Sequence, residues 1–256
     1  KPDISSPAAI LMDAKSGKVL YEKNSKQRYA PASITKIMTA LIVAENADMS
    51  DMVTYSANAT TNLESGAVTA GVTAGDIISV NDSMYALMLK SANEVANGLA
   101  EHVAGSVSSF AAKMNAKAKE LGATDTNFVN PSGLSDSNHY TTAYDLYLIF
   151  NEAMKDSRFM NYAGAPSYNV SYTAADGTQV TKSWKNGNRY ITGQAAAPRG
   201  IVVDAGKTGT TLAAGSCLVI CSENAEGKRY ISVVLKSKNR ADLYDNMSKL
   251  LSKINK

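Results

Sequence analysis

Strand patterns lie near both ends of this chain, and helical patterns fill the stretch between them. Residues 8–14 and 19–21 flank a Ser-Gly turn and predict a β-hairpin. The last third contains four short alternating or apolar segments, which predict strands at 168–172, 179–184, 218–221 and 230–235. This order predicts an α+β fold, in which one antiparallel sheet is built from both termini and flanked by helices, with a mainly helical lobe between.

Length and composition favour a single domain. The chain has 256 residues, of which 45% are hydrophobic and 19% charged, with six prolines and no Ser/Gly-rich linker. These values are typical of a globular domain with a large core. We therefore expect one domain over residues 1–256, with a sheet lobe of about 1–45 and 160–256 and a helical lobe of about 46–159.

Charge and hydropathy exclude several classes of protein. The net charge is +3, and the lysines and arginines are spread along the chain, so no nucleic-acid partner is expected. No stretch approaches the roughly 18 apolar residues that span a bilayer. Lys1-Pro2-Asp3 is polar and no apolar run follows it, so we expect no signal peptide in this chain.

The cysteines and histidines do not indicate a metal site or a disulfide. Cys217 and Cys221 lie four residues apart on a predicted strand. A rise of roughly 3.3 Å per residue separates them by about 13 Å, whereas a disulfide needs Cα atoms within about 7 Å. They are therefore expected to be buried small hydrophobes of no assigned role. His102 and His139 have no ligand partner at metal-site spacing and are expected to be surface or capping residues.

A helix is predicted to begin just after Pro31, and Ser33 lies in its first turn. Positions three apart share a helix face about 5–6 Å apart at Cβ, so Lys36 can reach the hydroxyl of Ser33. A neutral amine there can accept the proton, provided that burial or a neighbouring positive charge lowers the pKa of the lysine. The free N–H groups of the helix start can stabilise an oxyanion.

Two further short motifs accompany Ser33-Ile34-Thr35-Lys36. Ser91-Ala92-Asn93 interrupts a buried helical region, and Lys207-Thr208-Gly209 is placed just before a buried strand. A Ser-x-Asn triplet recurs elsewhere in the chain and means nothing alone, whereas Ser33 is the only serine with a lysine three residues later. Alone, each motif is an ordinary structural pattern such as a helix cap, a helix break or a turn. Their order and setting together indicate a catalytic site in which Lys207 supplies a second positive charge.

The three motifs are the signature of β-lactamases and penicillin-binding proteins. Beyond them, the chain resembles the low-molecular-mass D-alanyl-D-alanine carboxypeptidases, serine peptidase family S11, over nearly its whole length. The segments that carry this resemblance are residues 30–36, 89–94, 114–122, 128–134 and 206–211. The resemblance implies a β-lactamase/transpeptidase-like fold.

This family resemblance implies a function and three catalytic residues. Ser33 would attack the carbonyl of the penultimate D-Ala in a peptidoglycan stem pentapeptide, and Lys36 would take its proton. Ser91 would relay a proton to the departing D-Ala. Water would then release the acyl-enzyme, and β-lactam antibiotics would acylate Ser33 as covalent inhibitors. No metal and no organic cofactor is implied.

The substrate-binding residues are also implied by the resemblance. Asn93 would orient the substrate backbone, and Lys207 and Thr208 would face the terminal carboxylate. Gly209 completes that motif, and Thr210 would supply the second oxyanion-hole N–H beside that of Ser33.

Two departures from the family pattern stand out. The family often carries an arginine inside the Asn-x-Asn loop, but here the loop is Asn186-Gly187-Asn188 and is followed by Arg189. Arg189 and Arg199 are both candidates for binding the carboxylate. The C-terminal β-rich domain and amphipathic membrane anchor of many relatives are expected to be absent from this chain, so membrane association would depend on a missing anchor. The expected location is extracytoplasmic.

Two alternative functions remain open at this point. A class A-like β-lactamase would need a deacylating glutamate between the second and third motifs, where Glu101, Glu120 and Glu152 all read as helix residues and no Glu-x-x-x-Asn segment occurs. A non-catalytic β-lactam sensor would use the same acylation residues. The preferred stem peptide, the balance of endopeptidase and carboxypeptidase activity and the oligomeric state are not determined by the sequence.

Overall fold

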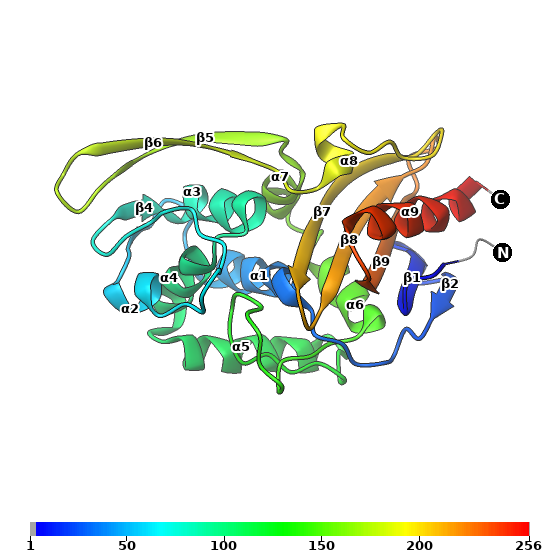
Figure 1. Cartoon of the computed structure of the whole chain (residues 1–256), viewed down its shortest axis with the longest axis horizontal. Coiled ribbons are helices and arrows are strands. Elements are labelled where there is room, and N and C mark those ends of the chain that lie inside the picture. Colours follow the sequence, from blue (N-terminus) through cyan, green and yellow to red (C-terminus); the bar gives the residue numbers. More distant parts are fainter. Residues whose placement is uncertain (1–3, 256) are drawn as a thin grey trace.

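The computed structural model describes residues 4–255 and contains two antiparallel sheets with helices packed around them (Figure 1). The larger sheet has five strands in the order β2-β1-β9-β8-β7. Its members are β1 (Ala8–Asp13), β2 (Val19–Lys23), β7 (Val202–Thr211), β8 (Gly215–Glu223) and β9 (Arg229–Ser237). Strands from both ends of the chain therefore form one sheet, as predicted, and β7 lies at its free edge. The polar opening Lys1-Pro2-Asp3 lies outside the described residues.

Helices cover both faces of this sheet. Helix α9 (Arg240–Leu251) packs Leu243 and Met247 against alternate strand residues such as Leu218. The opposite face, which includes Val219, packs in one core with α1 (Lys36–Asn46) and α6 (Ala143–Ala153). Coverage on both sides explains why β8 and β9 are almost continuously buried. Cys217 and Cys221 lie in β8 as buried free thiols, as predicted.

The second sheet was not predicted. It has the order β3-β4-β5-β6 and consists of β3 (Met52–Thr54), β4 (Ile77–Ser79), β5 (Ser167–Thr173) and β6 (Gln179–Lys185). The hairpin β5–β6 was placed with the terminal sheet, and this was wrong, because β5 pairs with β4 through Ile77 and Thr173. An alternating pattern identifies a strand but not its partner.

The remaining helices lie mostly in the middle of the chain, where helical patterns were predicted. They are α2 (Ala57–Thr61), α3 (Val80–Tyr85), η2 (Ala86–Lys90), α4 (Asn93–Ala104), α5 (Val107–Glu120), α7 (Ser157–Gly164), α8 (Arg189–Thr192) and η3 (Ser252–Asn255). Helix α3 is capped by Ser79, whose side chain accepts a hydrogen bond from the Asp82 N–H. Gly105 follows α4 in the left-handed conformation, as expected of a C-terminal glycine. Between residues 4 and 255, no helix combines the length and apolar character needed to cross a bilayer.

Candidate active site

Ser33 lies in the short 3₁₀ helix η1 (Ala32–Thr35), which leads directly into α1. Lys36 is the first residue of α1, and its Nζ lies 2.9 Å from Ser33 Oγ. The predicted contact across one turn is therefore present. Ala32, just before the serine, has a left-handed φ of 52°, a strained conformation for a residue with a side chain.

Lys36 is completely buried, with 0% of its surface exposed. Besides the serine, its Nζ contacts Asn93 Oδ1 at 2.7 Å and the Ser132 carbonyl oxygen at 2.8 Å. Burial lowers the pKa of Lys36 well below its ordinary value, and the charge of Lys207 lowers it further, whereas Glu94 opposes both effects. These contacts suit a neutral amine, which can donate to the two carbonyl-type oxygens and accept from the serine hydroxyl.

Ser91 lies where η2 ends and α4 begins. Its φ of 58° is left-handed, and this reversal separates the two helices. Lys207 Nζ donates to Ser91 Oγ at 3.2 Å and to the Thr208 carbonyl oxygen at 2.8 Å. Burial lowers the pKa of Lys207 to about 7. The second and third motifs thus meet directly, although 116 residues separate them.

Lys207, Thr208 and Gly209 lie within β7. They do precede a buried strand, β8, as expected, but the sequence did not show that they lie in a strand of their own, which begins at Val202. Because β7 is the edge strand, part of its backbone is free of strand partners and is available to a ligand. The next residue, Thr210, is exposed and pairs in register with Ser216.

Gly209 allows β7 to lie directly against Ser33. A Cβ on this residue would lie 2.9 Å from the Ser33 nitrogen and 3.0 Å from the Ile34 nitrogen. Both are backbone atoms that cannot move aside cheaply. Gly187, in the Asn186-Gly187-Asn188 loop, also lies close to β7, since a Cβ on this residue would lie 3.2 Å from the side-chain oxygen Oγ1 of Thr208.

The loop from Asn130 to Gly133 forms the floor of the site, a role that the sequence did not reveal. Thr39 Oγ1 donates to the Pro131 carbonyl, and the Ser132 carbonyl receives Lys36. Gly133 has a φ of 89°, and a Cβ there would lie 1.8 Å from the Ala32 carbonyl oxygen. The sequence marked this loop by its resemblance to the family over residues 128–134 and by its Asn-Pro-Ser-Gly composition, which predicts a turn and not its neighbours.

Glu94 is a second residue that the motif analysis did not single out. It is 1% exposed, and its Oε2 accepts hydrogen bonds from the backbone N–H groups of Ala70 at 2.9 Å and Val72 at 3.2 Å. Burial raises the pKa of this carboxyl, although the two backbone hydrogen bonds oppose the shift. Glu94 is directly adjacent to Asn93 in sequence and lies close enough to influence Lys36.

The sequence predicted that His139 is a surface or capping residue, and this prediction is wrong. It is 3% exposed, and its Nε2 lies 2.8 Å from Thr35 Oγ1 while its Nδ1 accepts from the Val129 N–H at 3.0 Å. Burial lowers the pKa of His139 to about 4. A neutral ring therefore holds the turn that contains Ser33. His102 lies 3.5 Å from Asp51 at the surface.

Comparison with known proteins identifies the family. A family model described as D-alanyl-D-alanine carboxypeptidase, peptidase S11, matches residues 1–239.

The chain belongs to this family.

Curated relatives include DacC of Escherichia coli strain K12, which is 33% identical over 98% of this chain and 61% of its own length. DacF of Bacillus subtilis strain 168 is 38% identical over 61% of this chain and 41% of its length. The chain therefore spans less than two thirds of the length of these relatives. The crystal structure of the Streptomyces K15 DD-transpeptidase matches with a TM-score of 0.91 and 30% identity over 99% of this chain and 98% of that one. The transpeptidase-like fold is thereby confirmed.

Among the described residues, no hydrogen bond or ion pair joins the side chain of Arg189 or Arg199 to Lys207. The Arg189 guanidinium lies over the ring of Tyr244 in α9, with 5.5 Å between its central carbon and the ring centroid. Arg199 is exposed in the loop before β7. Lys207 is therefore the buried cation at this end of the site.

Proposed function

We propose that this chain is a serine-type D-alanyl-D-alanine carboxypeptidase that removes the terminal D-Ala from peptidoglycan stem pentapeptides through an acyl-serine intermediate. The observation that carries the proposal is the 2.9 Å contact between Ser33 Oγ and the buried Lys36 Nζ. Family membership gives the substrate class. Since peptidoglycan lies outside the cytoplasmic membrane, the enzyme works extracytoplasmically.

Acylation involves the side chains of Ser33, Lys36, Ser91 and Lys207 and two backbone N–H groups. Lys36 accepts the Ser33 proton as the oxygen attacks the penultimate D-Ala carbonyl. The oxyanion that forms is held by the backbone N–H groups of Ser33 and Thr210. Ser91, hydrogen-bonded to Lys207, relays a proton to the departing D-Ala nitrogen as the C–N bond breaks, and the proton that Lys36 took from Ser33 restores the Ser91 hydroxyl.

Substrate binding uses the residues around this centre. The positive Lys207 and the hydroxyl of Thr208 receive the terminal carboxylate, and Gly209 leaves room for the strand to lie beside Ser33. Asn93 orients the substrate amide through the part of its side chain that Lys36 does not use. Water then hydrolyses the ester and restores Ser33. A β-lactam follows the same acylation steps and leaves slowly.

One feature of the loop beside Lys36 supports the proposal that β-lactams are released slowly. The atom that this loop presents to the amine is the backbone carbonyl of Ser132, not the carboxylate that a class A-like β-lactamase uses for deacylation. The carboxypeptidase is therefore favoured over the β-lactamase.

The test is intact-mass spectrometry after exposure to benzylpenicillin, together with D-Ala release from diacetyl-Lys-D-Ala-D-Ala. We expect one stable adduct and steady D-Ala release for the wild type, and neither for Ser33→Ala. Ser109→Ala, an exposed serine of α5, is the matched control and should behave as the wild type. An adduct on Ser33→Ala would exclude this nucleophile. Rapid loss of the adduct would favour a β-lactamase, and an adduct without D-Ala release would favour a sensor.

A further inference from the structure

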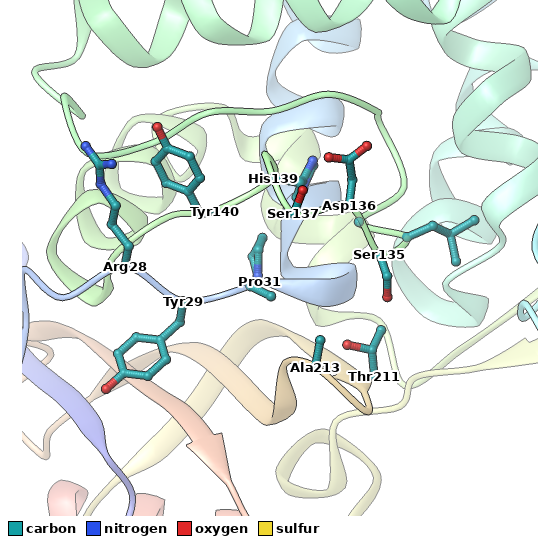
Figure 2. A pocket seen from close by; sticks show the side chains of 13 residues that line it. Arg28, Tyr29, Pro31, Ser135, Asp136, Ser137, His139, Tyr140, Thr211 and Ala213 are labelled. Atoms are coloured by element: carbon teal, nitrogen blue, oxygen red, sulfur yellow. The ribbon is translucent and has the colours of Figure 1, made fainter.

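A cavity of about 650 Å³ opens beside the nucleophile without containing any of the residues assigned to catalysis. Pro31, Gly133 and Thr211 form its inner border, and each belongs to a segment that surrounds Ser33. Figure 2 shows Tyr29 and Tyr140 on one side and Asp136 on the other. The cavity is therefore a continuation of the active site.

The direction of β7 indicates which part of a substrate reaches this cavity. Lys207 and Thr208, which receive the terminal carboxylate in the proposed function, precede Gly209 on the strand, whereas Thr211 and Ala213 border the cavity. A peptide lying along this edge advances by roughly 3.3 Å per residue. With its C-terminus at Lys207 and its scissile carbonyl at Ser33, the residues before the penultimate D-Ala must extend toward the cavity.

The charges around the cavity are not balanced. Arg28 is paired with Asp125 at 3.2 Å, and its guanidinium lies 4.5 Å from the centroid of the Tyr140 ring. His139 is neutral at physiological pH because burial lowers its pKa to about 4. Asp136 accepts a hydrogen bond from the Asn138 N–H through Oδ1, and among the contacts of residues 4–255 no cation pairs with it. The uncompensated charge at this cavity is therefore negative.

From this placement we propose that the cavity receives the side chain of the residue that precedes the two D-alanines, and that Asp136 selects a diamino acid with a free side-chain ammonium. The tyrosine rings and Pro31 accommodate the aliphatic part of that side chain, and the carboxylate meets its charged end. This inference rests on the proposed function, because the orientation of the peptide follows from it.

The test compares two peptides that differ by one charge, Nα-acetyl-Lys-D-Ala-D-Ala and diacetyl-Lys-D-Ala-D-Ala. At low ionic strength, kcat/KM of the wild type should be about three- to five-fold higher for the peptide with the free amine, as expected of an exposed ion pair. In Asp136→Asn this ratio should fall to about one. The variant retains the acceptor for the Asn138 N–H, and the rate of acylation by benzylpenicillin reports its folding.

Glu226→Gln is the matched control. It removes the same charge from the turn between β8 and β9, at the other end of the sheet, and should keep the wild-type ratio. Equal rates for the two peptides in the wild type, or an unchanged ratio in Asp136→Asn, would overturn the inference while leaving the proposed function intact. Absence of D-Ala release from both peptides would overturn both.

Discussion

Lys36 Nζ lies 2.9 Å from Ser33 Oγ and 2.8 Å from the Ser132 carbonyl oxygen, so one buried amine joins the serine to the loop beneath it. The serine hydroxyl is the partner that can donate a proton to a neutral amine. We therefore expect variants of Lys36 to change both the rate of acylation and the stability of the protein.

Lys36→Ala should nearly abolish acylation, because among residues 4–255 no other basic side chain is hydrogen-bonded to the Ser33 hydroxyl. We expect the second-order rate constant with benzylpenicillin to fall by about 100- to 10,000-fold. Lys36→Met fills more of the buried volume and should show the same loss with a smaller decrease in the free energy of unfolding. Acylation at the wild-type rate in either variant would mean that another group deprotonates Ser33.

The pH dependence of kcat/KM should have two limbs. As pH falls, protonation of Lys36 removes the base and the rate decreases, and because the pKa of Lys36 is lowered this limb lies on the acidic side. As pH rises through about 7, free Lys207 loses its proton and binds the substrate carboxylate more weakly. Arginine stays protonated, so Lys207→Arg should lose the alkaline limb, whatever its absolute rate. An alkaline limb that stays near pH 7 in this variant would contradict the assignment.

Glu94→Gln should move the acidic limb to lower pH, because removing a buried negative charge favours the neutral form of Lys36. Glutamine still offers an oxygen to the N–H groups of Ala70 and Val72. A purely structural residue would change the rate at all pH values without moving the limb. The measurement is a full pH profile of acylation for the wild type and the variant.

Gly209→Ala should lower kcat/KM by about 100-fold or more, because the new methyl group would push β7 away from the backbone of Ser33. Gly227→Ala is the control for a loss of stability alone, since its Cβ meets open space but its φ of 78° is unsuited to alanine. It should cost stability without loss of activity. If Gly209→Ala keeps wild-type kinetics at a lowered melting temperature, the close approach of β7 to Ser33 is not needed for catalysis.

His139 should make the protein less stable at acidic pH. Its pKa is about 4 in the folded state and about 6.5 when exposed. The unfolded state therefore binds the proton first, and the free energy of unfolding should fall by about 3 kcal/mol as pH decreases from 6.5 to 4. Urea denaturation at pH 7 and pH 4.5 measures the difference. His139→Gln should flatten this dependence, and a slope equal to that of the wild type would assign it to other groups.

Local patterns in the sequence determined the elements and the first half of the site. The contact of Ser33 with Lys36 follows from helical spacing alone, since residues three apart share a face. The terminal hairpin and the helical middle were also readable, because side-chain periodicity is a property of neighbouring residues. The short motifs and the longer matching segments then indicated the family.

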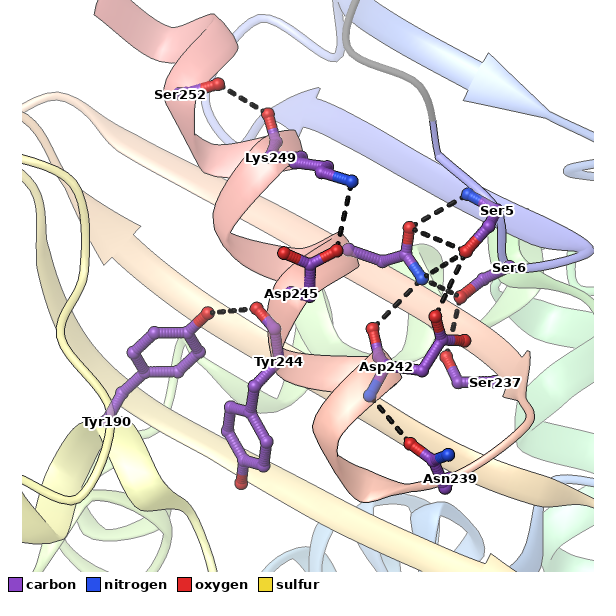
Figure 3. Close-up of polar contacts among 11 residues, drawn as sticks. Ser5, Ser6, Tyr190, Ser237, Asn239, Asp242, Tyr244, Asp245, Lys249 and Ser252 are labelled. Carbon is purple, nitrogen blue, oxygen red and sulfur yellow. Dashed lines mark hydrogen bonds and ion pairs between the residues drawn. The ribbon is translucent and has the colours of Figure 1, made fainter.

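Tertiary structure decided what neighbouring residues cannot specify. Burial of Lys36 and the meeting of Lys207 with Ser91 depend on packing between distant segments. The same holds at the termini, where Ser5 and Ser6 hydrogen-bond to Asn246 of α9 across some 240 residues (Figure 3). Periodicity gives each segment its conformation and its apolar face. Which apolar face packs against which is settled only when the whole chain excludes water from one core, and that exclusion lowers the pKa values of Lys36 and Lys207.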